Sequence, residues 1–273
     1  MKKLSSSDKD TVEALFQSSI YTNTHFGWFD CWQIAADNGV IWFDESNSEK
    51  HLIALQFISS DTLWFHSFFS TAPVESYPLI EKLRSILAPG NYSIYSISSH
   101  SWYSSFLKNN GFRISDEIIQ METDSIPVKN NRSFKEIQPF FPHQSEIIWD
   151  ECERIFPLIW RLDKKEYYAA CKTSDYRRVM MVDGRIAGYL LAEIDESDKN
   201  CDITRIVILP DYQQKGFARS LIDQMIIDCS PLNIKSYSVN TNKNNKPAIN
   251  FYKRLNFKQV GSTYPVFYRY IRI

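Results

Sequence analysis

Glycine is scarce in this sequence, with eight in 273 residues. Gly216 is the only one between Gly188 and Gly261, and none lies between Gly39 and Gly90. The patterns G-x-G-x-x-G, Walker A and G-x-S-x-G, each of which needs closely spaced glycines, are absent. The sequence therefore gives no support for a dinucleotide-binding Rossmann domain, a P-loop NTPase or an α/β-hydrolase.

Cysteine and histidine residues show none of the spacings typical of redox motifs or metal sites. The chain has an odd number of cysteines and no C-x-x-C spacing, with single cysteines at positions 31, 152, 171, 201 and 229. We expect reduced, mostly buried thiols in a cytoplasmic protein. Four of the five histidines lie in the first half without metal-ligand spacing, so no metal site is predicted. Met1-Lys2-Lys3 precedes a polar stretch, and no apolar run reaches the roughly 18 residues of a membrane span.

Net charge is only −1, but it is unevenly distributed. Residues 1–125 carry 8 Lys+Arg against 15 Asp+Glu, a net of −7, and residues 126–273 carry 23 against 17, a net of +6. A basic second half suits a polyanionic ligand, although a chance difference between two domains fits as well. The basic residues form no dense run, so a nucleic-acid partner is not expected. With 44% hydrophobic residues, the chain can bury substantial cores.

The most informative segment joins a strand to a helix. The β-branched run Ile206-Val207-Ile208 stops at Pro210, and a polar loop leads to Gly216. The next residues have the apolar spacing of one helix face, at Ala218, Leu221, Ile222, Met225, Ile226 and Cys229. The free amides at the start of a helix attract anions, and a glycine there lets a ligand approach the backbone. We therefore predict a pyrophosphate-binding loop, made by Gln213, Gln214, Lys215, Gly216, Phe217 and Ala218.

Two motifs in this order resemble the GNAT acyltransferase superfamily. Gln213-x-x-Gly216-x-Ala218 is similar to its acetyl-CoA signature, Q/R-x-x-G-x-G/A. Further along, Asn245, Ala248 and Tyr252 fall at i, i+3 and i+7, on one face of a helix. They resemble the family's N-x-x-A-x-x-x-Y helix, which is followed by a G-F element. Here Asn256 replaces that glycine, a mild departure because asparagine tolerates a left-handed helix cap.

The resemblance implies roles for these residues. Acetyl-CoA would be the acyl donor, and the backbone of Ile206, Val207 and Ile208 would pair with its pantetheine arm as an added strand. Tyr252 would protonate the leaving thiolate, because a phenol is protonated at neutral pH; the alternative is an aromatic side chain that only packs the helix. Asn245 would hold the pantetheine or the tyrosine, or would simply cap its helix.

The general base and the acceptor site stay open at this stage. Some family members carry a glutamate five residues before the helix asparagine, where this chain has Asn240. Glu193 and Asp202 are weaker candidates, and a water chain or an amine that binds already neutral fits equally. In the family the acceptor site is lined by the region that here contains the aromatic residues Trp149, Phe156, Trp160, Tyr167 and Tyr168. Packing of the helix core is the favoured explanation of that group.

The chain also contains a faint internal repeat. Residues 105–112 resemble residues 250–257 at an offset of 145, which places Leu107 opposite Tyr252 and His100 opposite Asn245. In the first half we expect helices near 8–19, 74–87 and 101–109, and strands near 40–44, 51–58, 62–68, 92–98 and 117–122. In the second half we expect helices near 144–159, 164–172, 217–229 and 246–255, strands near 134–138, 177–182, 185–194, 202–208 and 234–240, and a closing hairpin.

These patterns predict two tandem GNAT-like domains of the α/β (α+β) class, each a mixed, mostly antiparallel twisted sheet flanked by helices. Residues 1–125 would be a degenerate copy without a cofactor loop or an acid, residues 126–133 a linker, and residues 134–273 the catalytic domain. The expected activity is acetyl transfer from acetyl-CoA to a primary amine, either a small molecule or a protein amino terminus. The alternative is an acyl-CoA-binding sensor that no longer transfers. We expect a monomer that acts as a pseudo-dimer of GNAT domains, without a membrane or nucleic-acid partner.

Overall fold

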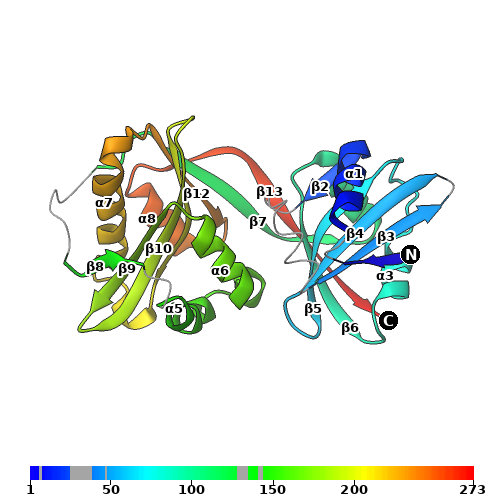
Figure 1. Cartoon of the computed structure of the whole chain (residues 1–273), viewed down its shortest axis with the longest axis horizontal. Coiled ribbons are helices and arrows are strands. Elements are labelled where there is room, and N and C mark those ends of the chain that lie inside the picture. The colour runs from blue at the N-terminus through cyan, green and yellow to red at the C-terminus, as the bar shows by residue number, and fades with distance from the viewer. Residues whose placement is uncertain (6–7, 25–38, 47, 128–134, 141–143) are drawn as a thin grey trace. The chain divides into compact units, whose positions relative to one another are not determined.

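The computed structural model describes residues 1–5, 8–24, 39–46, 48–127, 135–140 and 144–273. The chain divides into two compact units. Unit 1 contains Met1–Glu117 together with Tyr264–Ile273, and unit 2 contains Ile118–Thr263. Each unit is built as a sheet with helices on both faces (Figure 1).

Unit 1 is a mixed sheet in the order β1-β3-β4-β5-β6, in which β2 also pairs with β5. Its strands are β1 (Lys2–Leu4), β2 (Tyr21–Thr24), β3 (Gly39–Ser46), β4 (Glu49–Phe57), β5 (Thr62–Ser70) and β6 (Asn91–Ile97). Its helices are α1 (Lys9–Ser18), α3 (Leu79–Ile86) and α4 (Ser101–Asn109). The pairs are antiparallel except β5 with β6. Helix α1 buries Val12 and Leu15 on one face, and α3 and α4 bury Leu79 and Phe106 in the other core.

Unit 2 repeats this plan in the order β12-β11-β10-β9-β8. Its strands are β8 (Ile137–Pro139), β9 (Tyr176–Val182), β10 (Arg185–Asp195), β11 (Asn200–Ile208) and β12 (Ser236–Asn242). Its α-helices are α5 (Ser145–Cys152), α6 (Lys164–Thr173), α7 (Phe217–Cys229) and α8 (Lys246–Lys253). Only β11 and β12 are parallel among these pairs. Helices α7 and α8 pack on one face through Leu221 and Ile249, and α5 and α6 pack on the other through Ile148 and Tyr167.

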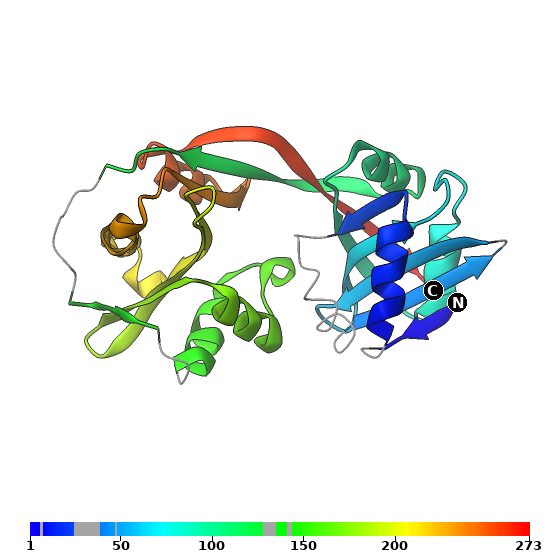
Figure 2. The same cartoon turned by 45° about the horizontal axis from the view of Figure 1, so that its top comes forward.

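Two strands belong to both units. Strand β7 (Arg113–Thr123) begins in unit 1, but its residues 118–123 pair with β12 of unit 2. Strand β13 (Lys258–Arg272) begins in unit 2, but its residues 266–272 pair with β6 of unit 1. The two strands are neighbours in the sheet, and Figure 2 shows β7 in green beside β13 in red. Each unit is therefore completed by a strand that the other half of the chain supplies.

The exchanged segments are part of the hydrophobic cores. Ile119 and Met121 of β7 are 3% and 0% exposed and pack in the core of unit 2. Phe267 and Ile271 of β13 are 0% and 3% exposed and pack in the core of unit 1. Burial of such side chains contributes about 1.5–3 kcal/mol each, so the exchange stabilises both units substantially.

The predicted fold class and tandem repeat are confirmed. In both halves three antiparallel strands are followed by a helix, a parallel strand, a second helix and a long strand, and α4 and α8 lie at the offset of the sequence repeat. Gly111 and Asn256, which are equivalent in that repeat, both follow their helix with a positive φ, of 73° and 68°. Asn256 therefore adopts the left-handed conformation that the glycine of the family motif would take.

Three details differ from the sequence-based expectation. The closing hairpin is wrong: residues 258–272 form one strand, because β7 already provides the antiparallel neighbour. The helix expected at 144–159 ends at Cys152 and continues as a 3₁₀ turn, Glu153–Ile155, since Pro157 disfavours helical backbone at Phe156.

The compact units also do not follow the linear division at 126–133, because residues 118–125 lie in unit 2 and residues 264–273 in unit 1. Residues 128–133 of the predicted linker are outside the described residues.

Within the described residues, no helix is both long and apolar enough to span a membrane. The four cysteines in this part of the structure are free thiols and buried, at positions 152, 171, 201 and 229. Cys31 lies outside it.

The strand exchange makes a prediction about fragments. A fragment of residues 126–273 lacks the β7 segment, so β12 keeps an open edge and the core loses Ile119 and Met121. We expect it to aggregate or to melt without cooperativity, because exposed edges and lost core side chains both destabilise a sheet. Thermal melting followed by circular dichroism measures this.

The matched control is the contiguous fragment 118–263, which is unit 2 with its β7 segment. This fragment should be soluble and melt in one transition. Equal solubility and melting of the two fragments would show that the exchanged strand is dispensable.

Candidate active site

The predicted pyrophosphate loop forms the start of α7. After β11 the chain makes a 3₁₀ turn, Pro210–Tyr212, and enters the helix through Gly216. Gln214 and Gly216 have left-handed backbone, with φ of 61° and 87°. The first helical hydrogen bond runs from the amide of Ser220 to the carbonyl of Gly216, at 3.0 Å. The amides of residues 217–219 therefore have no acceptor within the helix and carry its positive end.

Side chains hold this loop in shape while leaving it open. The Nε2 of Gln213 donates to the carbonyl of Ile208 at 2.9 Å, and the Nζ of Lys215 donates to the carbonyl of Asp211 at 2.8 Å. A Cβ atom added to Gly216 would meet no atom within 4 Å. The loop thus has room for an anion above exposed amides and beside the cation of Lys215. Phe217 and Ala218, the other predicted loop residues, are half-buried, and Phe217 packs against the core of unit 2.

The parallel strands β11 and β12 separate close to this loop. They pair from Asn200 with Ser236 to Ile203 with Val239, and the pairing ends there. Beyond this fork, Ile206, Val207 and Ile208 remain paired with β10 on their other edge. The edge of β11 that faces β12 is therefore no longer paired with β12 at these three residues, and their pairing with a pantetheine arm stays a prediction.

The geometry of β11 changes at the fork itself. Ile203 and Thr204 together oppose Ala192 of β10, which is a β-bulge. Gly188 lets β10 approach β11 closely, since a Cβ there would lie 2.1 Å from the carbonyl oxygen of Val207. Both features keep β11 bound to β10 while its other edge diverges from β12.

Helix α8 supplies the two residues of the second motif. Asn245 is the helix N-cap, and its Oδ1 accepts the amide hydrogen of Ala248 at 3.3 Å. Tyr252 is 4% exposed, and its ring packs against Phe251 and Phe257. Its hydroxyl makes no hydrogen bond with any residue in the described ranges. The capping role of Asn245 is thus present in the structure, and a contact with a ligand stays a prediction.

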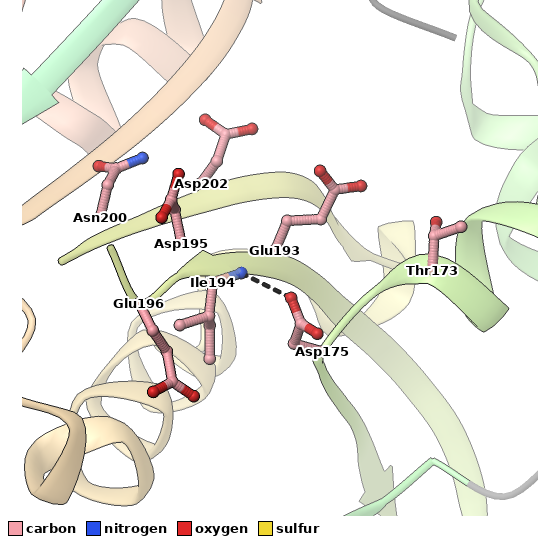
Figure 3. Close-up of a pocket in the computed structure, with 8 residues that line it drawn as sticks. All are labelled: Thr173, Asp175, Glu193, Ile194, Asp195, Glu196, Asn200 and Asp202. Atoms are coloured by element: carbon pink, nitrogen blue, oxygen red, sulfur yellow. Dashed lines mark hydrogen bonds between the residues drawn. The ribbon is translucent and has the colours of Figure 1, made fainter. Parts of the chain in front are cut away.

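Two of the candidate bases lie together on the sheet. Glu193 of β10 is the register partner of Asp202 of β11, and Figure 3 shows both carboxylates on the same side of these strands. The Oδ1 of Asp202 accepts a hydrogen bond from the Oγ of Ser238 at 2.6 Å. Burial raises the pKa of Asp202, and burial with the charges of Asp202 and Asp175 raises the pKa of Glu193.

Asp202 also lies near the predicted acid. Burial first, and then the negative charge of Asp202, raise the pKa of Tyr252. The phenol therefore stays protonated throughout the neutral range. Asn240, which takes the family's glutamate position, lies on β12 next to Val239 at the fork.

A buried ion pair joins Arg205 of β11 to Glu153, which directly follows α5, and the sequence analysis did not predict it. Arg205 and Glu153 are 14% and 3% exposed, and their closest N–O distance is 2.5 Å. The same carboxylate accepts hydrogen bonds from the hydroxyl of Tyr189 at 2.7 Å and from the amide of Leu162 at 3.1 Å. The guanidinium of Arg205 lies 3.8 Å from the ring centroid of Phe156. No local pattern connects residues 52 positions apart, so no sequence signal announced this pair.

The aromatic group in the region that lines the acceptor site in the family packs mainly in the core. Tyr167 is fully buried in the α5–α6 cluster, and the Nε1 of Trp149 donates to the carbonyl of Leu162 at 3.0 Å. Tyr168 is 38% exposed. The favoured core-packing interpretation agrees with these positions.

The described residues of unit 1 contain no equivalent of this site. Leu107, the counterpart of Tyr252, is fully buried, and the neighbouring hydroxyl of Tyr103 lies 3.0 Å from the Oγ of Ser96. Helix α3 begins after Pro78 rather than after a glycine loop. Among the residues that the structure describes, no cluster of three metal-ligating side chains occurs in either unit.

Comparison with known proteins places unit 2 in a family. Residues 139–257 match the model of the acetyltransferase (GNAT) family. No curated protein sequence matches the chain.

Solved structures share the fold of the whole chain. A tandem GNAT protein from the clavulanic acid biosynthesis pathway aligns with a TM-score of 0.62 at 12% identity, over 99% of this chain and 97% of its own. A probable N-acyltransferase of unknown function from Enterococcus faecalis aligns with a TM-score of 0.64 at 9% identity, over 98% and 71%. A GNAT-family acetyltransferase from Colwellia psychrerythraea aligns with a TM-score of 0.59 at 13% identity, over 98% of each chain.

The buried ion pair makes a stability prediction. Glu153→Gln removes the anion and leaves the buried guanidinium of Arg205 unpaired, which should lower the free energy of unfolding by about 3–5 kcal/mol. Urea denaturation measures this. Asp150→Asn is the control, because it makes the same chemical change in the exposed pair of Asp150 with Arg154 and should cost less than about 1 kcal/mol. Similar losses in the two variants would contradict a stabilising role for the buried pair.

Proposed function

Residues 139–257 belong to the GNAT acetyltransferase family, and on this premise we propose that the chain is an acetyl-CoA-dependent N-acetyltransferase whose activity resides in unit 2. The acceptor would be a primary amine that attacks the thioester directly. The observation that carries the proposal is the fork of β11 and β12 after Ile203 and Val239, beside Tyr252 and at the end of the strand that leads into the α7 loop.

The residues of unit 2 fit acetyl-CoA in three places. The free amides at the start of α7 and the Lys215 cation suit the pyrophosphate. The open edge of β11 at residues 206–208 suits the amides of the pantetheine arm. The fork would then bring the thioester towards Tyr252.

The reaction needs a proton acceptor and a proton donor. The amine nitrogen attacks the thioester carbonyl and loses a proton, for which Asp202 is the candidate acceptor at the fork, with Glu193 next to it. The bond from carbon to sulfur breaks, and the thiolate receives the proton of the Tyr252 hydroxyl. Burial keeps that phenol protonated, and the negative charge of Asp202 does the same.

In this proposal unit 1 has a structural role. It retains helices and strands of the repeat, but Leu107, at the position of Tyr252, is fully buried in its core and has no hydroxyl to donate. It also supplies the first part of β7, whose end completes the sheet of unit 2.

Binding of acetyl-CoA should depend on Gly216. Gly216→Glu places a side chain and a negative charge at the helix start where the pyrophosphate would lie, so calorimetry should show one site per chain that this change abolishes. Gly216→Ala is the control, because it imposes the same backbone strain at φ 87° without adding charge, and it should retain measurable binding. Two sites per chain, or unchanged affinity in the Glu variant, would contradict the assignment.

Catalysis should depend on the Tyr252 hydroxyl. A positioned general acid contributes roughly 10²–10⁴-fold to rate, so Tyr252→Phe should lower kcat by that order. Affinity for acetyl-CoA and stability should change little, because the hydroxyl makes no hydrogen bond within the described part of the chain and the ring packing remains. Steady-state release of free thiol and a binding titration measure the two effects.

Two other outcomes would contradict parts of the proposed mechanism. A kcat within a few-fold of the parent shows that another group protonates the thiolate. Tight acetyl-CoA binding without thiol release for any amine would make unit 2 an acyl-CoA-binding module and would overturn the proposed transfer.

A further inference from the structure

A pocket of about 540 Å³ opens on the sheet of unit 2. It is formed by the turn from α6 to β9, the end of β10 and the start of β11 (Figure 3). Five of its eight lining residues are acidic and none is Lys or Arg: Thr173, Asp175, Glu193, Ile194, Asp195, Glu196, Asn200 and Asp202.

These carboxylates are not neutralised by the protein. None of the five forms an ion pair within the described residues. Asp175 accepts the amide of Ile194 at 2.8 Å, and Asp195 accepts the amide of Ser197 at 2.8 Å, so these two also hold the loops of the pocket. Glu193 makes no hydrogen bond or ion pair with a described residue. A concave site with this charge attracts cations.

The acidic groups also oppose one another. The pKa of Glu193 is raised by burial and by the charges of Asp202 and Asp175. A bound cation would relieve this repulsion, because it stabilises all of the nearby carboxylates in their charged form. Carboxylates provide strong hydrogen bonds to ammonium groups.

The pocket lies next to the fork of β11 and β12. Asp202 lines it, and Asp202 is paired with Ser238 one position before the fork at Ile203 and Val239. Tyr252 is 4% exposed, its hydroxyl is unpaired among the described residues, and it lies close enough to Asp202 for that charge to act on it. One end of the pocket therefore lies at Asp202, next to the fork, and Glu193 and Asp175 line the rest of it.

We propose that the acceptor is an aliphatic amine with a second cationic group. Glu193 and Asp175 hold this second group, while the reacting nitrogen lies at Asp202 and Tyr252. The inference rests on the proposed function, because it assigns the substrate class of the same site.

This arrangement gives the acidic residues separate roles. The reacting nitrogen loses one proton to Asp202 before it attacks and a second proton, which restores the Tyr252 hydroxyl, as the amide forms. The second ammonium keeps its charge throughout. Acetylation turns one amine into a neutral amide, so the product carries one positive charge fewer than the substrate. The acidic pocket therefore holds the product less tightly, which favours its release.

The test compares cadaverine with pentylamine, which has the same carbon chain and one amino group. Thiol release in the presence of acetyl-CoA gives kcat/KM for both, and calorimetry gives the binding of cadaverine. We expect cadaverine to be the better substrate, and Glu193→Gln to lower its kcat/KM and its affinity about tenfold, because one charge-assisted contact is lost. The variant should lower kcat/KM for pentylamine much less than for cadaverine, because pentylamine has no second cation to lose. Asp183→Asn, in the turn between β9 and β10, removes the same charge outside the pocket and should alter neither substrate.

The outcomes separate the two proposals. If both amines release thiol equally well and Glu193→Gln changes neither, transfer stands and the dicationic acceptor is overturned. If cadaverine binds, Glu193→Gln weakens that binding, and no amine releases thiol, the cationic pocket stands and the transfer function fails. If Asp183→Asn weakens cadaverine as much as Glu193→Gln does, the effect is general electrostatics and the pocket assignment is overturned.

Discussion

The open edge of β11 is the constraint on which the site depends. A parallel strand normally pairs along its whole length, because unpaired backbone groups are costly. Here the ladder with β12 stops at Ile203 and Val239, while β11 continues to Ile208. The bulge at Ile203 and Thr204 turns the strand, and the Arg205–Glu153 pair fixes it to the α5 side of the sheet. Contacts with β10 on one edge of β11, and with Glu153 on one of its faces, thus maintain the fork.

Partial pairing of the parallel strands is common to both units, so the difference between the units lies in the neighbouring helices. Strands β5 and β6 of unit 1 are also parallel, and their pairing covers only Thr62–Trp64 with Ser93–Tyr95. The helices beside these strands differ from those of unit 2, because Leu107 and Tyr103 of α4 are buried in the core and α3 starts without a glycine loop. Unit 1 therefore keeps the framework of the repeat without the parts that unit 2 offers to an anion and an amine.

Short-range patterns allowed much of the fold and part of the site to be predicted. Helix α7 was predicted with its observed bounds, because periodicity, Pro210 and Gly216 mark its start within a few residues. The exchange of β7 and β13 was not predictable in this way, since the alternation of a strand is the same whichever sheet it joins. The acidic pocket and the Glu153–Arg205 pair likewise combine segments that are far apart in the sequence and carry no mutual signature.

The strand exchange also has a consequence for how the protein is made. Ribosomes deliver the amino-terminal part first, and domains usually fold in that order. Unit 1 cannot follow this order fully, because its sheet is completed by Tyr264–Ile273, which are synthesised after all of unit 2. Until then β6 lacks its β13 neighbour, and Phe267 and Ile271 are missing from the core. The sheet that emerges first is therefore completed only after all of unit 2 has been synthesised.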